Sequence, residues 1–297
     1  MHEGEFTGYM RIVSFLKSFI SAWQDYPVQS GTLLGERFLV HELIGEGSYG
    51  LTYKCTDTTD GSLVAVKQSR PSKGAFARQM MKKEGALLRS LQHSRFPTFI
   101  DLFSERNHIF LAMSYIIGDT LEELIFEQGK RYGEQECIDI TIQLLELVCY
   151  IHDQGLVHLD LRIPNVLIYR DQLHLLDFGL ANRVVDHSFP LESDGKAELK
   201  WRKRRGPFKP VNKVTDLQDI GHFMLFLLYS NYDSVNKPDN SKGAQADQDW
   251  QKELVISNEL KIIIERLLQP QPSYSSSLHL KNDLCRITAK QSALVVP

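Results

Sequence analysis

A glycine-rich stretch, LIGEGSYGLTY, is the first feature of the sequence that can take part in chemistry. It places Gly45, Gly47 and Gly50 in a Gly-x-Gly-x-x-Gly pattern, with Ser48 and Tyr49 between the last two glycines. The same spacing marks dinucleotide-binding folds, but there the glycines lead into a helix, whereas here they lead into a predicted strand. A hairpin tip without side chains at three positions lets backbone N–H groups close over the phosphates of a nucleotide. Taken alone, the pattern is also that of an ordinary hairpin.

A lysine and a glutamate follow at positions that also suit phosphate binding. Lys67 ends a predicted strand, VAVK, and Glu84 comes 17 positions later on a predicted helix. A lysine on a sheet beneath the glycine loop can neutralise phosphate oxygens, while a glutamate on the facing helix holds its ammonium in place. As isolated residues both would be solvated surface charges. The motifs that follow them therefore decide between the two interpretations.

Two acidic motifs come next along the chain. The mostly apolar stretch HLDLRIPN carries Asp160 and Asn165, with His158 and Arg162 on either side of the aspartate. Twelve residues after Asn165, the stretch LLDFGLA supplies Asp177. The chain thus presents, in order, a glycine-rich loop, a strand lysine, a helix glutamate and two acidic motifs.

The elements that must position these residues begin with a β-rich part. Alternating β-branched and aromatic residues predict three strands between Phe38 and Lys67. Asp60-Gly61 between the second and third strands indicates a hairpin, because a type I′ turn needs positive φ at both central residues. The next predicted elements are a helix over residues 75–91 and strands over residues 99–103 and 108–114.

Beyond Gly118 the character of the sequence changes to a mostly helical one. Apolar residues at helical spacing predict long helices over residues 134–153, 216–230 and 258–268. The boundary between the β-rich and the helical part is expected near residues 116–119. No internal repeat is present in the sequence.

Composition limits the class of protein. The 297 residues are 42% hydrophobic and 24% charged, which is enough to bury one or two cores. The net charge near −3 gives no global attraction to nucleic acid or to an anionic membrane. The acidic N-terminus resembles neither a signal peptide nor a membrane span, so we expect a cytoplasmic protein. The four widely spaced cysteines, which we expect to be reduced thiols without zinc, are Cys55, Cys137, Cys149 and Cys285.

Three segments stand apart from this core. Residues 10–23 form a predicted amphipathic helix, which packs on the body of the protein, lies on a membrane surface or binds a partner helix. Between Lys196 and Lys213, eight basic residues and one acidic residue give a local charge of +7. This segment is either a solvated loop or a surface that attracts acidic substrates, nucleic acid or anionic lipid. Residues 231–249 are polar and are predicted to form a solvated loop.

The motifs, in their order and spacing, resemble the signature set of protein kinases. The matching stretches are GEGSYG, VAVK, Glu84 nine residues before His93, YIHDQGLVHLDLRIPN, LLDFGLA and DLQDIG. The resemblance covers about residues 37–286 and is strongest to the short serine/threonine-type (Hanks-type) kinases of Gram-positive bacteria. It implies an α+β, bilobal protein-kinase fold with a β-rich N-lobe, a helical C-lobe and ATP between them. The implied parts are a helix and linker over 1–35, the N-lobe over 36–116, the C-lobe over 117–290 and a tail over 291–297.

The resemblance also implies roles for the acidic motifs. Asp160 would accept the proton of the attacking hydroxyl, and Asn165 and Asp177 would hold the Mg²⁺ ions that bridge the phosphates of ATP. Arg162 stands where serine/threonine kinases usually carry lysine and would contact the γ-phosphate as a planar fork. Phosphate transfer needs charge neutralisation and alignment more than covalent help, so acids, an amide and a lysine such as Lys67 suffice.

Nucleotide recognition is implied by LAMSYIIGD, which resembles the hinge of the family. Met113 would be the gatekeeper, and the backbone of Ser114 and Ile116 would pair with the adenine edge. Asp119 or Thr120 would reach the ribose, or Thr120 would instead cap the helix that follows. The implied nucleotide-binding residues are Ile44, Gly45, Gly47, Ser48, Gly50, Thr52, Ala65, Lys67, Glu84, Met113, Ser114, Ile116 and Leu167, with Ala65 and Leu167 on the two faces of the ring.

The sequence departs from the family pattern at two places. Leu159 replaces the arginine that usually precedes the catalytic aspartate and pairs with an activation-loop phosphate, which argues against switching by phosphorylation. Only Ser188 and Ser193 between residues 177 and 206 carry hydroxyls in any case. The Ala-Pro-Glu motif is absent, and so is its partner arginine near Tyr274. Joint loss avoids a buried unpaired charge and predicts a loosely held substrate platform.

We therefore expect an ATP-dependent kinase that phosphorylates serine or threonine in proteins, with acidic proteins bound by residues 196–213 and no specific nucleic-acid partner. A small-molecule kinase of the same superfamily is the second hypothesis, since such enzymes share the aspartates and the asparagine. A nucleotide-binding pseudokinase scaffold is the third. Residues 10–23 are expected to contact either a membrane surface or a partner, unless they pack on the kinase itself.

Overall fold

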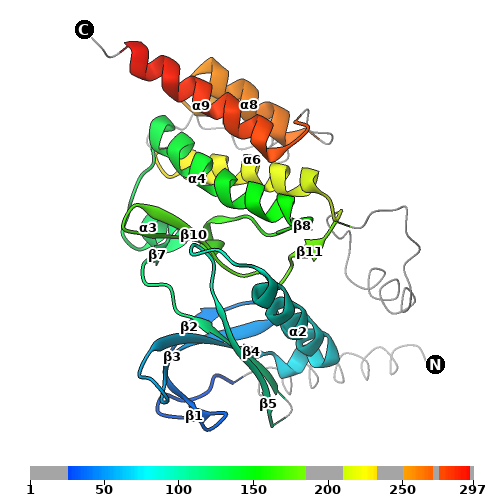
Figure 1. The fold of residues 1–297 in the computed structure, drawn as a ribbon. Helices are drawn as coiled ribbons and strands as arrows, with labels where there is room; N and C mark the ends of the chain where they lie inside the picture. Colours follow the sequence, from blue (N-terminus) through cyan, green and yellow to red (C-terminus); the bar gives the residue numbers. More distant parts are fainter. Residues whose placement is uncertain (1–25, 107, 185–209, 233–249, 270–273, 295–297) are drawn as a thin grey trace, which may run out of the picture. The chain divides into compact units, whose positions relative to one another are not determined.

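The computed structural model describes residues 26–106, 108–184, 210–232, 250–269 and 274–294 (Figure 1). These residues form two compact units that divide between Ile117 and Gly118, one residue beyond the predicted lobe boundary. The predicted segments that lie wholly or mostly outside the described residues are the helix over 10–23, the basic segment over 196–213 and the polar run over 231–249.

The first unit is built on a six-stranded antiparallel sheet with strand order β1-β2-β3-β4-β6-β5. Its strands are β1 (Leu33–Leu34), β2 (Phe38–Glu46), β3 (Gly50–Asp57), β4 (Leu63–Ser69), β5 (Phe99–Glu105) and β6 (His108–Ser114). The five longer strands agree with those predicted from alternation. Strand β1 differs, because the predicted linker over 1–35 pairs with β2 there and buries Leu34 in the core.

The hairpin between β3 and β4 is present, but the predicted type I′ turn is wrong. Only Gly61 has a positive φ, +77°, and Asp60 does not. The loop is longer than two residues: the N–H of Gly61 donates to the carbonyl of Asp57 at 2.8 Å, and the N–H of Asp57 donates to Ser62 at 2.9 Å. The Asp57 carboxylate also accepts the N–H of Thr59, a local side-chain bond that stabilises the longer loop.

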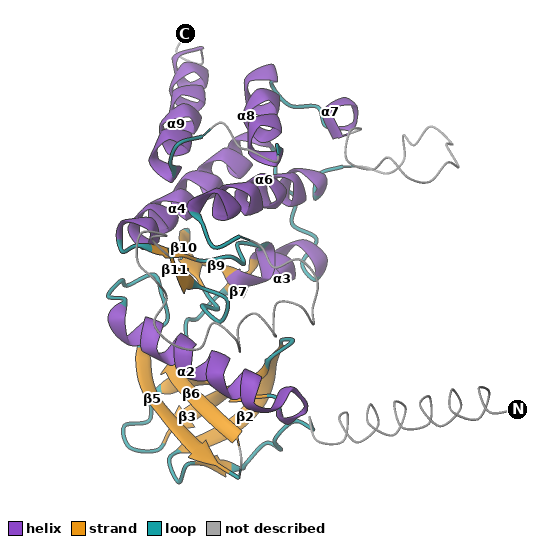
Figure 2. Cartoon of the chain, turned by 90° about the vertical axis from the view of Figure 1, so that its right-hand side faces the viewer, coloured by secondary structure: helices purple, strands orange, loops and turns teal. Residues whose placement is uncertain are grey.

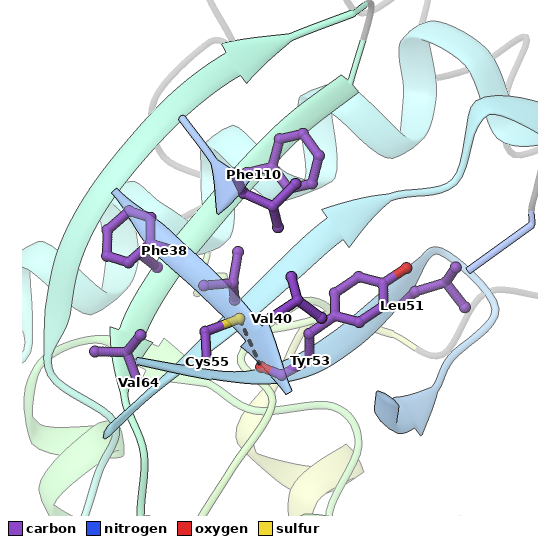
Figure 3. Packing of buried hydrophobic residues seen from close by; sticks show 10 residues of the cluster. Phe38, Val40, Leu51, Tyr53, Cys55, Val64 and Phe110 are labelled. Carbon is purple, nitrogen blue, oxygen red and sulfur yellow. Dashed lines mark hydrogen bonds between the residues drawn. The ribbon is translucent and has the colours of Figure 1, made fainter. Parts of the chain in front are cut away.

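One face of the sheet carries an apolar core (Figure 3), made by Phe38, Val40, Leu51, Tyr53, Cys55, Val64 and Phe110 together with Leu34, Val66 and Ala112. Two polar groups within it are satisfied. The Tyr53 hydroxyl accepts the N–H of Val28 at 3.0 Å and donates to Gln68 Oε1 at 2.7 Å. The Gln68 amide nitrogen in turn donates to His108 Nδ1 at 3.0 Å. Because side chains alternate along a strand, Lys67 is turned to the opposite face from Gln68.

A long helix packs against strands β5 and β6 of this sheet (Figure 2). It follows a short 3-10 turn, and the two elements are η1 (Pro71–Lys73) and α2 (Gly74–Ser90). A glycine allows the helix to approach the sheet closely, since a Cβ at Gly85 would lie 3.3 Å from Leu111 and 3.5 Å from Leu102. The close approach occurs beside Glu84, whose side chain therefore reaches the sheet.

The second unit is mainly helical. Its helical elements are α3 (Leu121–Phe126), α4 (Glu134–Asp153), η2 (Ile163–Asn165), α6 (Lys213–Tyr229), α7 (Trp250–Glu253), α8 (Asn258–Leu268) and α9 (Ser277–Leu294). Its short strands are β7 (Asp119–Thr120), β8 (Leu156–Val157), β9 (Val166–Tyr169), β10 (Gln172–Leu175) and β11 (Asn182–Arg183), paired in the orders β10-β9-β7 and β11-β8. The predicted helices over 134–153 and 258–268 are confirmed. Helix α6 begins earlier than predicted, because the Asn212 side chain caps it by accepting the N–H of Thr215 at 3.0 Å.

Helix α4 lies against both α6 and α9, and α6 in turn packs on α8 (Figure 1). A Cβ at Gly221 in α6 would lie 2.9 Å from the Cβ of Leu267 in α8, so only glycine permits this approach. None of the helices in the described part of the chain is both long and apolar enough to cross a membrane.

Candidate active site

A buried ion pair joins strand β4 to helix α2 in the first unit. The Lys67 ammonium lies 2.9 Å and 2.8 Å from the two carboxylate oxygens of Glu84. The side chains of Lys67 and Glu84 are only 11% and 2% exposed. The predicted contact between these residues is thus present, although they are 17 positions apart. A buried pair of this kind is costly to break, because removal of one partner leaves the other charge desolvated.

The glycine-rich loop connects β2 and β3 by a tight turn. The N–H of Gly47 donates to the carbonyl of Gly50 at 2.9 Å, which leaves Ser48 and Tyr49 at the tip as predicted. A Cβ at Gly50 would lie 3.0 Å from the carbonyl oxygen of Gln68. That spacing is tighter than ordinary van der Waals contact, so a side chain at this position would push the loop away from β4.

Further predicted nucleotide-binding residues lie on the same hairpin. Gly45 and Thr52 pair across β2 and β3, and a Cβ at Gly45 would lie 3.6 Å from the Thr52 Cβ, an ordinary contact. Ile44 is 41% exposed. Ser48 is exposed at the tip of the loop. These residues are accessible, and their contact with a nucleotide stays a prediction.

An arginine that the sequence analysis missed anchors the glycine-rich loop. The backbone N–H of Arg70 donates to the carbonyl of Tyr49 at 3.0 Å, and its Nε donates to the carbonyl of Gly47 at 2.8 Å. The guanidinium also lies 3.4 Å from Glu46. The Tyr49 ring makes an edge contact with Phe76 on α2, with 5.4 Å between centroids. No local pattern signals this role, because the arginine lies beyond the strand and its partners lie more than 20 residues upstream.

The predicted hinge residues lie at the end of β6. Met113 is buried and pairs in register with Ala65 of β4. The backbone N–H of Ser114 donates to the Thr98 carbonyl at 2.9 Å, and the Ser114 hydroxyl accepts the N–H of Thr98 at 2.8 Å. That N–H is therefore engaged within the first unit, and pairing of the Ser114 backbone with an adenine edge stays a prediction. Ile116 is half-buried.

In the second unit, Asp160 and Asn165 are held together by a single 3-10 turn. The N–H of Asn165 donates to the Arg162 carbonyl at 2.9 Å, which brings its side chain back to the aspartate. The Asn165 amide nitrogen donates to the backbone oxygen of Asp160 at 2.9 Å and to its carboxylate at 2.8 Å. The Arg162 Nε lies 3.0 Å from the other carboxylate oxygen. The five-residue separation of Asp160 and Asn165 thus places the carboxylate and the amide in contact.

The second aspartate motif is tied to the same loop. The N–H of Leu176 donates to the carbonyl of Asn165 at 2.8 Å, and the carbonyl of Leu176 contacts His158 Nε2 at 3.1 Å. Asp177 follows with a positive φ of +53°, and its Oδ1 accepts the N–H of Gly179 at 3.0 Å. Asp177 and Asn165 are thus positioned by neighbouring backbone hydrogen bonds.

A buried aspartate, to which the sequence motifs gave no role in the site, holds the loop over residues 158–165, which we call the catalytic loop. Asp216, fully buried on α6, accepts the N–H of Leu159 at 2.7 Å and the N–H of His158 at 2.9 Å. His152 Nε2 contacts the same carboxylate at 2.9 Å. Leu159 has a φ of +66°, which costs roughly 1–2 kcal/mol for a residue with a side chain. The bonds to the carboxylate offset this strain, because hydrogen bonds to charged groups contribute about 1.5–3 kcal/mol each. The signal for Asp216 was the DLQDIG motif.

A capping box decides between the two roles left open for Thr120, the last residue of strand β7. Its side chain accepts the N–H of Glu123 at 3.1 Å, while Glu123 accepts the N–H of Thr120 at 2.7 Å, which is a capping box for α3. The helix-cap interpretation is therefore confirmed, and a ribose contact by the exposed Asp119 stays a prediction. Leu167, which pairs with Thr120 across β7 and β9, is 5% exposed.

A pocket of about 230 Å³ opens beside Asp160. Its walls are formed by the catalytic loop and helix α6, through Asp160, Leu161, Arg162, Asp219, His222, Phe223 and Phe226. The pocket is therefore bounded by residues 160–162 and by helix α6, which the Asp216 carboxylate joins to the chain just before Asp160 through its bonds to His158 and Leu159.

The surroundings of Tyr274, where the resemblance implies an arginine in the family, contain an arginine from helix α8. Arg266 of α8 lies over the Tyr274 ring at 4.2 Å and pairs with Asp283 of α9 at 3.6 Å. Burial raises the pKa of Tyr274 to about 12. The cation near this tyrosine is thus paired within the second unit.

Comparison with protein-family models matches a protein kinase domain to residues 38–200, more than half of the chain. The chain belongs to the protein kinase family. The kinase is 32% identical over 264 residues to a probable serine/threonine-protein kinase, YbdM, of Bacillus subtilis, and the alignment covers 88% of this chain and 93% of that relative. Together these matches make it an ATP-dependent serine/threonine protein kinase.

More distant relatives agree with this assignment. The kinase is 28% identical over 244 residues to the smooth muscle myosin light chain kinase of Gallus gallus, which covers 77% of this chain but only 12% of that much longer protein. The crystal structure of the PF14_0431 kinase domain aligns with a TM-score of 0.63 at 17% identity, covering 86% of this chain and 97% of that one. At this identity the likeness shows the fold alone, and it agrees with the predicted β-rich and helical lobes.

Proposed function

We propose that Lys67, Asp160, Asn165 and Asp177 carry out phosphate transfer from ATP to a serine or threonine hydroxyl. The observation that carries this proposal is the ion pair between Lys67 and Glu84, at 2.8 Å and 2.9 Å. In protein kinases this pair must be in place for the lysine to bind the α- and β-phosphates. Its presence argues against a scaffold that has lost activity.

Asp160 takes the proton from the acceptor hydroxyl, and Arg162 neutralises charge at the γ-phosphate. One oxygen of Asp160 is held by Asn165 and the other by Arg162, at 2.8 Å and 3.0 Å, so the carboxylate is oriented. When Arg162 turns to the phosphate, the second oxygen is released toward the hydroxyl. The acceptor side chain enters through the pocket beside Asp160, whose lining includes the exposed ring of Phe226.

The donor groups of this site fit magnesium. The Asn165 amide nitrogen is used by Asp160, so its amide oxygen is the atom suited to a cation. Among the residues that the structure describes, no group of three or more His, Cys, Asp or Glu forms a complete metal cage. Mg²⁺ takes one or two protein ligands and completes its shell with phosphates and water, so Asn165 and Asp177 suffice as its protein ligands. Asn165 and Asp177 would hold the Mg²⁺, which would supply neutralisation of charge on the phosphates.

Nucleotide recognition is assigned to the hinge and the glycine-rich loop. The carbonyl of Ser114 and the backbone of Ile116 bind the adenine edge, and Met113 limits the depth of the site. The remaining nucleotide contacts proposed are those of Ile44, Gly45, Gly47, Ser48, Gly50, Thr52, Ala65, Glu84 and Leu167.

Activity does not depend on a phosphorylated activation loop. The side chain of Leu159 is buried and apolar, and it cannot pair with a phosphate as the usual arginine does. Substitution of both Ser188 and Ser193 with alanine should leave the rate of phosphate transfer unchanged. A loss of activity that phosphatase treatment of the unsubstituted kinase reproduces would contradict this part of the proposal.

The test of the proposed roles is transfer of labelled phosphate from ATP and Mg²⁺ to a general protein substrate. Asp160→Asn should abolish labelling while ATP binding, measured by calorimetry, stays largely intact. Lys67→Met should reduce both the labelling of the protein substrate and the affinity for ATP. Unchanged labelling by Asp160→Asn would remove the proposed base, and label that appears only in a small molecule would favour the second hypothesis.

Acidic proteins are the proposed substrate class, because the segment over 196–213 carries a charge of +7. Replacement of Arg202, Lys203, Arg204 and Arg205 by glutamine should raise KM for an acidic protein at low salt but not for a neutral one. An identical KM at low salt would leave this segment without a docking role. A cytoplasmic location, a lack of specific nucleic-acid binding and membrane or partner contact by residues 10–23 stay predictions.

A further inference from the structure

A chain of buried hydrogen bonds runs from the start of helix α9 to the catalytic loop. Ser277 Oγ lies 3.2 Å from His152 Nδ1, and His152 Nε2 lies 2.9 Å from the Asp216 carboxylate. That carboxylate accepts the N–H groups of His158 and Leu159, directly before Asp160. We propose that Ser277 is a positioning residue for the catalytic loop, acting through His152 and Asp216. The inference rests on the proposed role of Asp160.

The direction of the bonds follows from the chemistry of the groups. A carboxylate only accepts, so the His152 Nε2 must carry the proton that it donates to Asp216. When the ring carries one proton, the other nitrogen is an acceptor, and the Ser277 hydroxyl is the donor that satisfies it. The Ser277 oxygen can in turn accept the thiol proton of Cys149, which lies 3.3 Å away. Every bond in the chain therefore has one donor and one acceptor.

Burial makes this chain more than an incidental contact. Ser277, His152 and Asp216 are 4%, 3% and 0% exposed, so water cannot replace a lost partner easily. Which nitrogen of a histidine is protonated, and how its ring is oriented, is set by the bond at the other nitrogen. Hydrogen bonds in series also polarise one another, so the bond to Nδ1 strengthens the donation from Nε2. Ser277 thus acts on the carboxylate without touching it.

The catalytic loop is sensitive to this carboxylate because of its backbone. Leu159 has a φ of +66°, and the structure holds it there through the 2.7 Å bond to Asp216. If the carboxylate turns, Leu159 relaxes toward its ordinary conformation and moves the adjacent Asp160. Since Ser277 is the first residue of α9, the position of that helix is coupled to the catalytic aspartate.

The experiment compares Ser277→Ala, Ser277→Thr and Ser275→Ala in the full chain, with dephosphorylated casein as acceptor. Ser275 is exposed and lies two residues upstream, so its substitution is the matched control. Ser277→Ala should lower kcat roughly tenfold, less than the hundredfold that a misplacement of 1 Å can cost, and leave KM for ATP unchanged. Ser277→Thr, which keeps the hydroxyl, should retain most of the activity.

A spectroscopic readout separates positioning from a general loss of stability. The backbone amide signals of His158 and Leu159 in ¹H–¹⁵N spectra should shift in Ser277→Ala and exchange faster with solvent, but not in Ser275→Ala. If Ser277→Ala does not fold, Ser277→Cys, which has a weaker donor, should give an intermediate kcat and an intermediate shift. A reduced kcat with unchanged amide signals, or wild-type kcat with unchanged signals, would overturn the inference. Shifted amides with wild-type kcat, together with retained transfer by Asp160→Asn, would instead refute the proposed role of Asp160.

Discussion

The Cγ of Lys67 lies 3.3 Å from the position that a Cβ would take at Gly50. The glycine thus allows the loop to pass directly over the lysine side chain. In Gly50→Ala the new methyl group must displace either Lys67 or the loop. We expect KM for ATP to rise roughly tenfold, which corresponds to about 1.4 kcal/mol of lost transition-state stabilisation at unchanged kcat.

The matched control for this substitution is Gly133→Ala. Gly133 has an ordinary φ of −78°, and the nearest atom to an added Cβ is the end of the Glu136 side chain at 3.9 Å. Its KM for ATP should not change. Steady-state kinetics of the two variants decides the point, and equal KM values would show that the loop does not need to approach Lys67.

Arg70 should matter for ATP although it belongs to no motif. Arg70→Ala removes the 2.8 Å bond to Gly47 and the contact with Glu46, so the loop loses its side-chain anchor. One such bond contributes about 1 kcal/mol, so KM for ATP should rise by roughly fivefold. In Arg70→Lys the KM for ATP should lie between those of Arg70→Ala and the unsubstituted kinase, because an ammonium cannot reproduce the planar fork of a guanidinium. Lys82→Ala, which removes an exposed cation on α2, should behave as the unsubstituted kinase.

The ion pair between Arg37 and Asp57 predicts a pH dependence of stability. The two hydrogen bonds from the Arg37 Nε and a third from Nη2 hold the pKa of Asp57 well below its usual value. A depressed pKa contributes stability that is present above the unfolded value of about 4 and is lost as pH falls below it. The unfolding temperature should therefore fall further between pH 6 and pH 3 in the unsubstituted kinase than in Asp57→Asn.

The control for the acid prediction is an exposed pair. Glu42→Gln removes the ion pair with Lys54. The Glu42 and Lys54 side chains are 59% and 29% exposed, so the substitution should change neither the stability of the kinase nor the pH dependence of that stability. If the unfolding temperature falls by the same amount on acidification in Asp57→Asn and in the unsubstituted kinase, Asp57 does not contribute to the acid dependence of stability.

The cysteines should react in an order that follows burial. Burial raises the pKa of Cys55 and of Cys137 to about 12, so almost no thiolate forms at pH 8. Cys285 is exposed and should be alkylated first by iodoacetamide, with the half-buried Cys149 slower. Mass spectrometry at increasing urea should show Cys55 and Cys137 labelled only as the protein unfolds. Labelling of either before unfolding would contradict the burial of these side chains.

Much of the fold follows from local patterns that the sequence contains. The helix over 134–153 agrees with its predicted bounds, because helical hydrogen bonds and the spacing of apolar residues lie within one segment. The contact between Lys67 and Glu84 was predicted from the order of motifs. The type of the β3–β4 turn was not predicted correctly, because the side chain of Asp57 stabilises a longer loop than the Asp60-Gly61 pair indicates.

By itself the sequence determined the family, the order of the lobes and the acidic, amide and lysine groups of the site, since all of these lie in short motifs of fixed spacing. Only the tertiary structure decided which residues hold those groups in place. Arg70, Asp216 and Ser277 contact partners that are 23, 57 and 125 residues away in the chain. Such contacts depend on how helices and strands pack, and the strained backbone of Leu159 is stable only because the buried Asp216 carboxylate of helix α6 binds it.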